Sequence, residues 1–147
     1  MDPLTTVAVI VGAASVVGVG LWLHGRSNRR QAQTRLAGRP QRDPTSFGQA
    51  YFADPEAGLA AEVRHLLANH VPFPLDGLAP DDALVQDLRM DELDSLSTVD
   101  FLLAVEDHFE IKVADADARV MRTFRDLVEY LARQGVQPRG IQRHEVG

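Results

Sequence analysis

Ser95 places a hydroxyl group at the predicted beginning of a helix, directly after Asp94. We predict this helix from Ser95 to Phe109, because apolar residues recur along the segment at helical spacing. The amides and the dipole at a helix N-terminus stabilise a nearby phosphate group. No base is placed to take the proton from Ser95, and the sequence has neither a Ser-His-Asp order nor a glycine-rich phosphate loop. The residues therefore do not predict an enzyme.

The same predicted helix carries two apolar stripes. The first stripe has the i, i+4, i+8 spacing of a core face and consists of Phe101, Val105 and Phe109. The second stripe starts beside the serine and consists of Leu96, Val99 and Leu103. One stripe is enough for the helix's own core, so the second is free to contact a partner. The alternative is a helix that is buried on two sides.

This stretch resembles the acyl carrier proteins, and the resemblance covers roughly residues 55–134. The hallmark of that family is Asp-Ser-Leu at the start of the second helix, followed by an acidic and apolar helix that ends in Phe. Here the hallmark is Asp94-Ser95-Leu96, and further matching segments are Asp87-Leu88, Ala104-Val105-Glu106-Asp107-His108-Phe109, Ile111 and the last helix from Thr123 to Leu131.

The resemblance implies a carrier function for the domain. In that family the serine carries 4′-phosphopantetheine through a phosphodiester, and the terminal thiol holds an acyl group as a thioester. Ser95 is the implied attachment residue, and lipid or secondary-metabolite biosynthesis is the implied context. The implied partners are a phosphopantetheinyl transferase and acyl-transferring or synthase enzymes with basic docking faces.

Two groups of residues take roles from the same resemblance. The implied docking face consists of Asp94, Leu96, Val99, Asp100, Leu103, Glu106 and Asp107. From charge alone, its acids are equally an ordinary solvated helix face. The implied acyl pocket inside the bundle consists of Phe101, Leu102, Ala104, Val105, Phe109 and Leu127.

A second register of the family motif puts Glu92 at the attachment position, because Asp87-Leu88 would then have the usual spacing to the site. A carboxylate cannot form the phosphodiester, so this register predicts an unmodified carrier-like interaction module that recruits or regulates a membrane-bound partner. The Ser95 register instead lengthens the preceding loop by three residues and keeps the following helix in the family's register. Loops tolerate insertions better than packed helices do, which favours Ser95.

The N-terminal segment from Leu4 to Leu23 has twenty residues without a charge, which is the length of an apolar helix that spans a bilayer. We predict a single-pass transmembrane anchor over residues 4–23. Basic residues follow this segment closely and none precedes it, so the positive-inside rule predicts an outward N-terminus and a cytoplasmic domain. Small-xxx-small patterns at Ala8/Gly12 and Ala14/Gly18 would support a weak homodimer through the anchor.

The two parts of the chain that follow this segment carry opposite net charges. Residues 24–46 hold six arginines and one aspartate, whereas residues 54–133 hold 18 acidic and seven basic residues. An acidic domain repels nucleic-acid phosphates, so we expect no nucleic-acid binding. The chain has no cysteine, and His65, His70 and His108 lack metal-ligand spacing, so no metal site is predicted.

The predicted organisation has four parts. A basic flexible linker over residues 24–53 follows the anchor, because residues 38–48 are rich in turn formers and lack an apolar period. Residues 54–134 form the carrier-like domain, and residues 135–147 form a disordered tail. Within the domain we predict an all-α four-helix bundle with a long first loop, because three prolines and a glycine exclude helix over residues 71–80. Asp54 is the predicted N-cap of the first helix and Thr123, with Asp126, that of the last.

Overall fold

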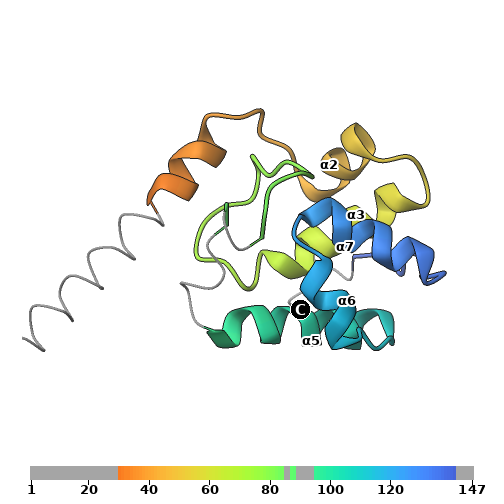
Figure 1. Ribbon diagram of the computed structural model, residues 1–147. Coiled ribbons are helices and arrows are strands. Elements are labelled where there is room, and N and C mark those ends of the chain that lie inside the picture. Colours follow the sequence, from red (N-terminus) through yellow and green to blue (C-terminus); the bar gives the residue numbers. More distant parts are fainter. Residues whose placement is uncertain (1–29, 85–86, 89–94, 142–147) are drawn as a thin grey trace, which may run out of the picture.

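The computed structural model describes residues 30–84, 87–88 and 95–141, and Figure 1 shows these parts as packed helices. No residue in these ranges belongs to a strand, and an isolated antiparallel bridge links Ala83 with Thr123. The predicted all-α class is therefore confirmed. Residues 30–37 form the first described helix, and the others follow as α2 (Pro44–Tyr51), α3 (Glu56–Leu67), α5 (Ser95–Phe109), α6 (Asp115–Val120) and α7 (Phe124–Arg133).

Helix α3 is central to the packing, since it contacts α2, α5 and α7. The core forms where the apolar faces of these helices meet, as their helical spacing predicts. Its fully buried side chains are Phe47, Leu59, Val63, Leu67, Leu88, Phe101, Val105, Phe124, Leu127, Val128 and Leu131. The first apolar stripe of α5 therefore faces the core, and α5 lies where the sequence predicts a helix from Ser95 to Phe109.

The ends of two helices test the predicted caps. The Thr123 hydroxyl accepts a hydrogen bond from the Asp126 amide at 3.1 Å, and the Asp126 carboxylate accepts one from the Thr123 amide at 3.0 Å. This reciprocal pair is a capping box, so the predicted cap of α7 is confirmed. At α3, however, Pro55 is the N-cap and makes no side-chain capping bond. The predicted cap at Asp54 is therefore wrong, and α3 begins at Glu56.

The described part of the expected flexible linker is folded. Residues 30–37 are helical and bury Ala32 and Leu36, and α2 buries Phe47. The ring of Phe47 meets that of Phe124 edge-on, with the centroids 5.2 Å apart and the planes at 84°. Arg64 of α3 is buried and donates to the backbone carbonyls of Arg42 and Asp43, the latter at 3.1 Å. Tertiary contacts therefore hold in place a segment whose composition predicts a loop.

The beginning of the expected disordered tail also packs on the bundle. Val136 is buried, and the Arg139 amide donates to both carboxylate oxygens of Glu62 at 2.8 and 3.0 Å. The Glu62 side chain is only 2% exposed, and His108 Nε2 lies 3.3 Å from its Oε1. The prediction of disorder is wrong for residues 135–141, because a buried carboxylate on α3 binds the backbone there. Residues 142–147 lie outside the described residues.

The predicted single-pass localisation needs correction. Within residues 30–84, 87–88 and 95–141, no helix combines the length and the apolarity that crossing a bilayer requires. The longest of the named helices, α5, has 15 residues, against about twenty for a bilayer core. None of the described helices supports the predicted single-pass localisation, which we withdraw. The segment 4–23, on which the predicted anchor and homodimer rested, lies outside the described residues.

Candidate functional site

Helix α5 begins at Ser95 and runs for 15 residues to Phe109, which are the bounds predicted from the sequence. Ser95 thus lies in the first turn, where backbone amides have no partner within the helix and stabilise an anion. The side chains of residues 95–97 and all of residues 89–94, including Glu92 and Asp94, lie outside the described residues. For Ser95, the structure describes the backbone position at the beginning of α5.

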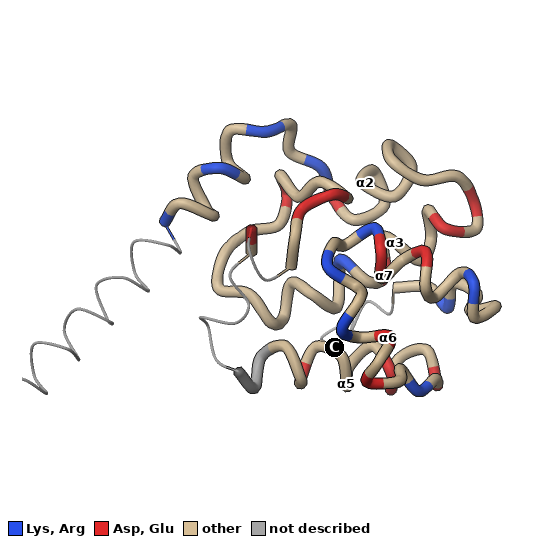
Figure 2. Tube along the Cα trace, viewed as in Figure 1, with Lys and Arg blue, Asp and Glu red and all other residues tan. Residues whose placement is uncertain are grey.

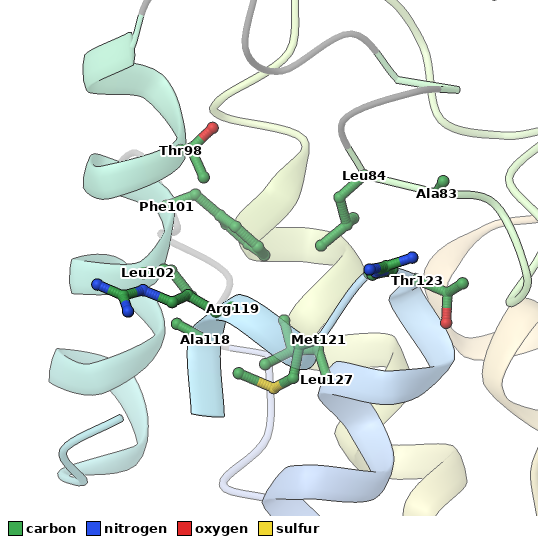
Figure 3. Close-up of a pocket in the computed structure, with 11 residues that line it drawn as sticks. Ala83, Leu84, Thr98, Phe101, Leu102, Ala118, Arg119, Met121, Thr123 and Leu127 are labelled. Atoms are coloured by element: carbon green, nitrogen blue, oxygen red, sulfur yellow. The ribbon is translucent and has the colours of Figure 1, made fainter. Parts of the chain in front are cut away.

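A cavity of about 560 Å³ lies beside α5, and Thr98, one helical turn after Ser95, is among its lining residues. Figure 3 shows side chains from α5, α6, the beginning of α7 and the preceding loop that face into it. The lining residues are Ala83, Leu84, Thr98, Phe101, Leu102, Ala118, Arg119, Met121, Arg122, Thr123 and Leu127. Most of these side chains are apolar, and the volume is in the range of small-molecule sites in proteins. The cavity can therefore hold an apolar chain.

Half of the predicted acyl-pocket residues line this cavity. Phe101, Leu102 and Leu127 are lining residues, whereas Ala104, Val105 and Phe109 are not. Val105 and Phe109 follow Phe101 down the core face of α5, and both are buried in the central core. Ala104 is partly buried and also lies further along the helix. The cavity is restricted to the N-terminal half of α5, so these three residues lie beyond its end.

The remaining wall comes from residues that the sequence analysis did not assign to a pocket. Ala83 and Leu84 come from the loop, and Ala118 and Met121 come from α6 and the residue after it. Helix α6 has only six residues and none of them is buried, so it lacks the apolar period that would mark a core-facing wall. The length of the loop was visible in the sequence, but its path past α7 was not.

Backbone hydrogen bonds fix the loop wall against the beginning of α7. The Leu84 amide donates to the Arg122 carbonyl at 2.9 Å, and the Arg125 amide donates to the Pro80 carbonyl at 2.8 Å. The Phe124 amide also donates to the carbonyl of Asp82 at 3.2 Å. The capping box of α7 and the cavity wall are therefore parts of one hydrogen-bonded assembly.

The predicted docking face is exposed where the structure describes it. The side chains of Val99 and Leu103 are 52% and 47% exposed, and Asp100 and Asp107 are exposed as well. Glu106 is partly buried and pairs with Lys112 at 3.0 Å, and this contact raises the pKa of Lys112. The side chains of Asp94 and Leu96 lie outside the described residues. In Figure 2, acids gather along α5 and α6, whereas arginines follow residues 30–42.

No group of three or more metal-binding side chains occurs in the part of the chain that the structure describes. The site there consists of a helix N-terminus, an apolar cavity beside it and an exposed apolar and acidic face. This arrangement suits a phosphate-linked arm: a serine can form the phosphodiester, helix amides stabilise its phosphate, and the cavity accepts an apolar cargo.

Comparison with known proteins identifies the same segment. Residues 61–131 match the family described as phosphopantetheine attachment site. An acyl carrier protein of Syntrophobacter fumaroxidans is 30% identical over 77 residues, which are 52% of this chain and 91% of that protein. An acyl carrier protein of Bdellovibrio bacteriovorus is 33% identical over 61 residues, which are 40% of this chain and 78% of that protein.

The family match covers α5, α6 and most of α3 and α7, so it includes Ser95 and the residues that line the cavity. The prosthetic group of the family is covalently attached 4′-phosphopantetheine, which presents the thiol that binds the acyl group. Phosphopantetheinyl transferases and synthase enzymes are the partners that the family implies. The chain belongs to the acyl carrier protein family, as a carrier of acyl groups on phosphopantetheine and not as an enzyme.

Proposed function

We propose that Ser95 is the attachment residue and that this carrier presents thioester-bound acyl groups to enzymes of lipid or secondary-metabolite biosynthesis. One observation carries the proposal: α5 begins at Ser95, and Thr98, one turn later on the same helix, lines the apolar cavity. An arm attached at the beginning of α5 would start one helical turn from a site for its own cargo. The proposed carrier domain comprises residues 54–134, and the described residues 30–52 and 135–141 pack on it.

The position of the helix supports the Ser95 register over the Glu92 register. A phosphodiester at Ser95 would lie in the first turn of α5, where the helix amides and dipole stabilise its charge. Glu92 precedes the helix by three residues, and its carboxylate cannot form a phosphodiester. The three additional residues of the Ser95 register fall in the loop, where an insertion costs little.

Each part of the site has a distinct task in this proposal. The exposed Val99 and Leu103, together with Asp100 and Asp107, form the described part of the face on which the transferase and the synthases dock. Their basic docking faces would meet its acids, and the apolar side chains would be buried in the contact. Phe101, Leu102 and Leu127 then shelter the acyl chain between successive enzymes. Sheltering keeps the thioester cargo away from water.

The test is the intact mass of the full chain after incubation with coenzyme A and a promiscuous phosphopantetheinyl transferase. We expect the wild type to gain the mass of one phosphopantetheine arm and Ser95→Ala to gain none. Ser97→Ala is the matched control, because it removes the same hydroxyl two residues further along α5, and it should be modified like the wild type. Circular dichroism of all three proteins verifies that their helices are intact.

Other outcomes assign the chain differently. If Ser97→Ala abolishes the mass gain and Ser95→Ala does not, the arm is attached at Ser97. If the folded wild type gains no mass, the protein is an unmodified carrier-like interaction module, and the binding partners of α5 become the question.

A further inference from the structure

We propose that Arg35 and Arg39, on the helix of residues 30–37 and just after it, are positioning residues that hold one wall of the cargo cavity. This inference rests on the proposed function. The two arginines lie outside the segment 61–131 that matches the carrier family, yet their side chains reach the loop that lines the cavity.

The two arginines meet two aspartates of that loop. Arg35 bridges both: its Nη2 lies 2.9 Å from Asp82 Oδ1, and its Nη1 lies 2.5 Å from Asp87 Oδ1. Arg39 Nη1 lies 2.5 Å from the other oxygen of Asp82. The Asp82 side chain is only 3% exposed and both of its oxygens are paired with cations, whereas the Arg35 and Arg39 side chains are 45% and 29% exposed. Charge-assisted bonds of this kind are among the stronger polar contacts in proteins.

The same carboxylates also shape the loop itself. Asp82 Oδ2 accepts a hydrogen bond from the Ala79 amide at 2.9 Å, and Asp87 Oδ2 accepts one from the Ala83 amide at 2.7 Å. The Asp87 amide donates back to the Ala83 carbonyl at 2.9 Å. Asp82 and Asp87 therefore close the turns on either side of residues 83–84, which form the cavity wall.

Close packing fixes the arginines relative to the loop. Leu36 lies between them in the sequence, is only 4% exposed, and packs its backbone against Gly77. Arg39 Nη1 also donates to the Gly77 carbonyl at 3.4 Å. The helix therefore cannot slide along the loop without breaking these contacts, and the guanidinium groups stay opposite Asp82 and Asp87.

Loss of the cations would affect the wall more than the fold. Without Arg35 and Arg39, Asp82 would be a buried carboxylate without a cation, and such groups favour rearrangement that lets water in. The hydrogen bond from Arg35 also lowers the pKa of Asp87, which shows that this contact favours the charged carboxylate. Rearrangement of Asp82 or Asp87 would release the turns that hold Ala83 and Leu84 against the cavity.

The experiment compares the full chain with the double variant Arg35→Ala/Arg39→Ala. The transferase loads each protein from coenzyme A or from octanoyl coenzyme A, and intact mass verifies loading. The measured quantity is the rise in Tm from the arm-bearing form to the octanoyl form. A merely structural role would lower both Tm values equally, whereas a positioning role lowers their difference.

We expect the wild type to show a clear rise and the double variant to lose about half of it or more, because a tethered ligand stabilises the folded state only while its site is formed. Arg125→Ala is the matched control. It removes an ion pair of 2.9 Å between Arg125 and Asp81 in the same loop, without touching the N-terminal helix, and should keep the full rise. If the double variant does not fold, Asp87→Asn removes one of the charge pairs and should lose part of the rise.

Two results would overturn the inference. A full rise in the folded arginine or Asp87 variant would show that the wall forms without the ion pairs. No rise in a wild type that carries the octanoyl group would show that the cavity does not hold the cargo. Failure of the proposed function is distinct from both, because the wild type would then gain no mass from either form of coenzyme A.

Discussion

The carbonyl oxygen of Leu36 lies where a side chain on Gly77 would be, since a Cβ added at Gly77 would come within 1.8 Å of it. This close approach joins the helix of residues 30–37 to the long loop that precedes α5. Only glycine permits it, because every other residue places a carbon atom between the two backbones.

Gly77→Ala should therefore lower the free energy of unfolding by about 2–3 kcal/mol, since overpacking against backbone forces the chain to shift. Denaturant unfolding of the full chain, followed by circular dichroism, measures the change. Gly38→Ala is the control on the same side of the contact, where the nearest atom to an added Cβ is 3.7 Å away. Equal stability of the two variants would mean that the helix does not pack on the loop as described.

The ion pair of Asp87 with Arg35 predicts how the free energy of unfolding depends on pH. The hydrogen bond from Arg35 holds its pKa below the ordinary value of 3.8 in the folded state. A carboxyl group whose pKa is lowered by folding stabilises the folded state at pH values above its ordinary pKa. This stabilisation is lost as the pH falls through the folded-state pKa. The difference in unfolding free energy between wild type and Asp87→Asn should be constant near neutral pH and shrink below about pH 4. A difference that grows on acidification would contradict the ion pair.

The capping box of α7 predicts the effect of Thr123→Ala. The variant removes the acceptor for the Asp126 amide and should cost about 1 kcal/mol of stability. The hydrogen bond from the Thr123 amide lowers the pKa of Asp126. Asp126→Asn should therefore also be less stable than the wild type at pH values above the ordinary carboxyl pKa. Thr45→Ala, at an exposed position in α2, is the control and should be close to neutral in denaturant unfolding.

The exposed apolar stripe of α5 predicts a change in recognition without a change in stability. Leu103→Asp should lower kcat/KM of the phosphopantetheinyl transferase by about tenfold or more, because a charge would replace an apolar side chain of the proposed docking face. Its Tm should stay close to that of the wild type, since Leu103 is 47% exposed. Ala50→Asp adds the same charge at an exposed position of α2. A similar loss of kcat/KM in both variants would indicate a general effect of charge.

The sequence predicted well those elements whose signals are local. Helix α5 has a strong apolar period and a defined beginning, and the capping box of α7 needs residues only three apart. The turn-rich loop was likewise evident from its prolines. Family membership followed from a short motif around Ser95, because that motif encodes chemistry and not only packing.

The sequence failed where long-range contacts decide the structure. Residues 30–52 have few apolar side chains, and Phe47 reveals its role only through Phe124, which is distant in the sequence. Arg64 and Asp82 belong to residue types that are mostly exposed, yet each is buried among partners that no periodicity marks. Three of the six residues predicted for an acyl pocket line the cavity, whereas its other walls depend on how the loop and α6 pack.

The packing of Phe47 into the core bears on protein engineering. A carrier domain trimmed to residues 61–131, the length that sequence matching suggests, would lack α2 and uncover the buried face of Phe124. Newly exposed apolar patches promote aggregation. A segment of this carrier that is grafted onto a foreign enzyme should therefore begin no later than residue 30. A shorter segment would expose apolar surface and tend to aggregate.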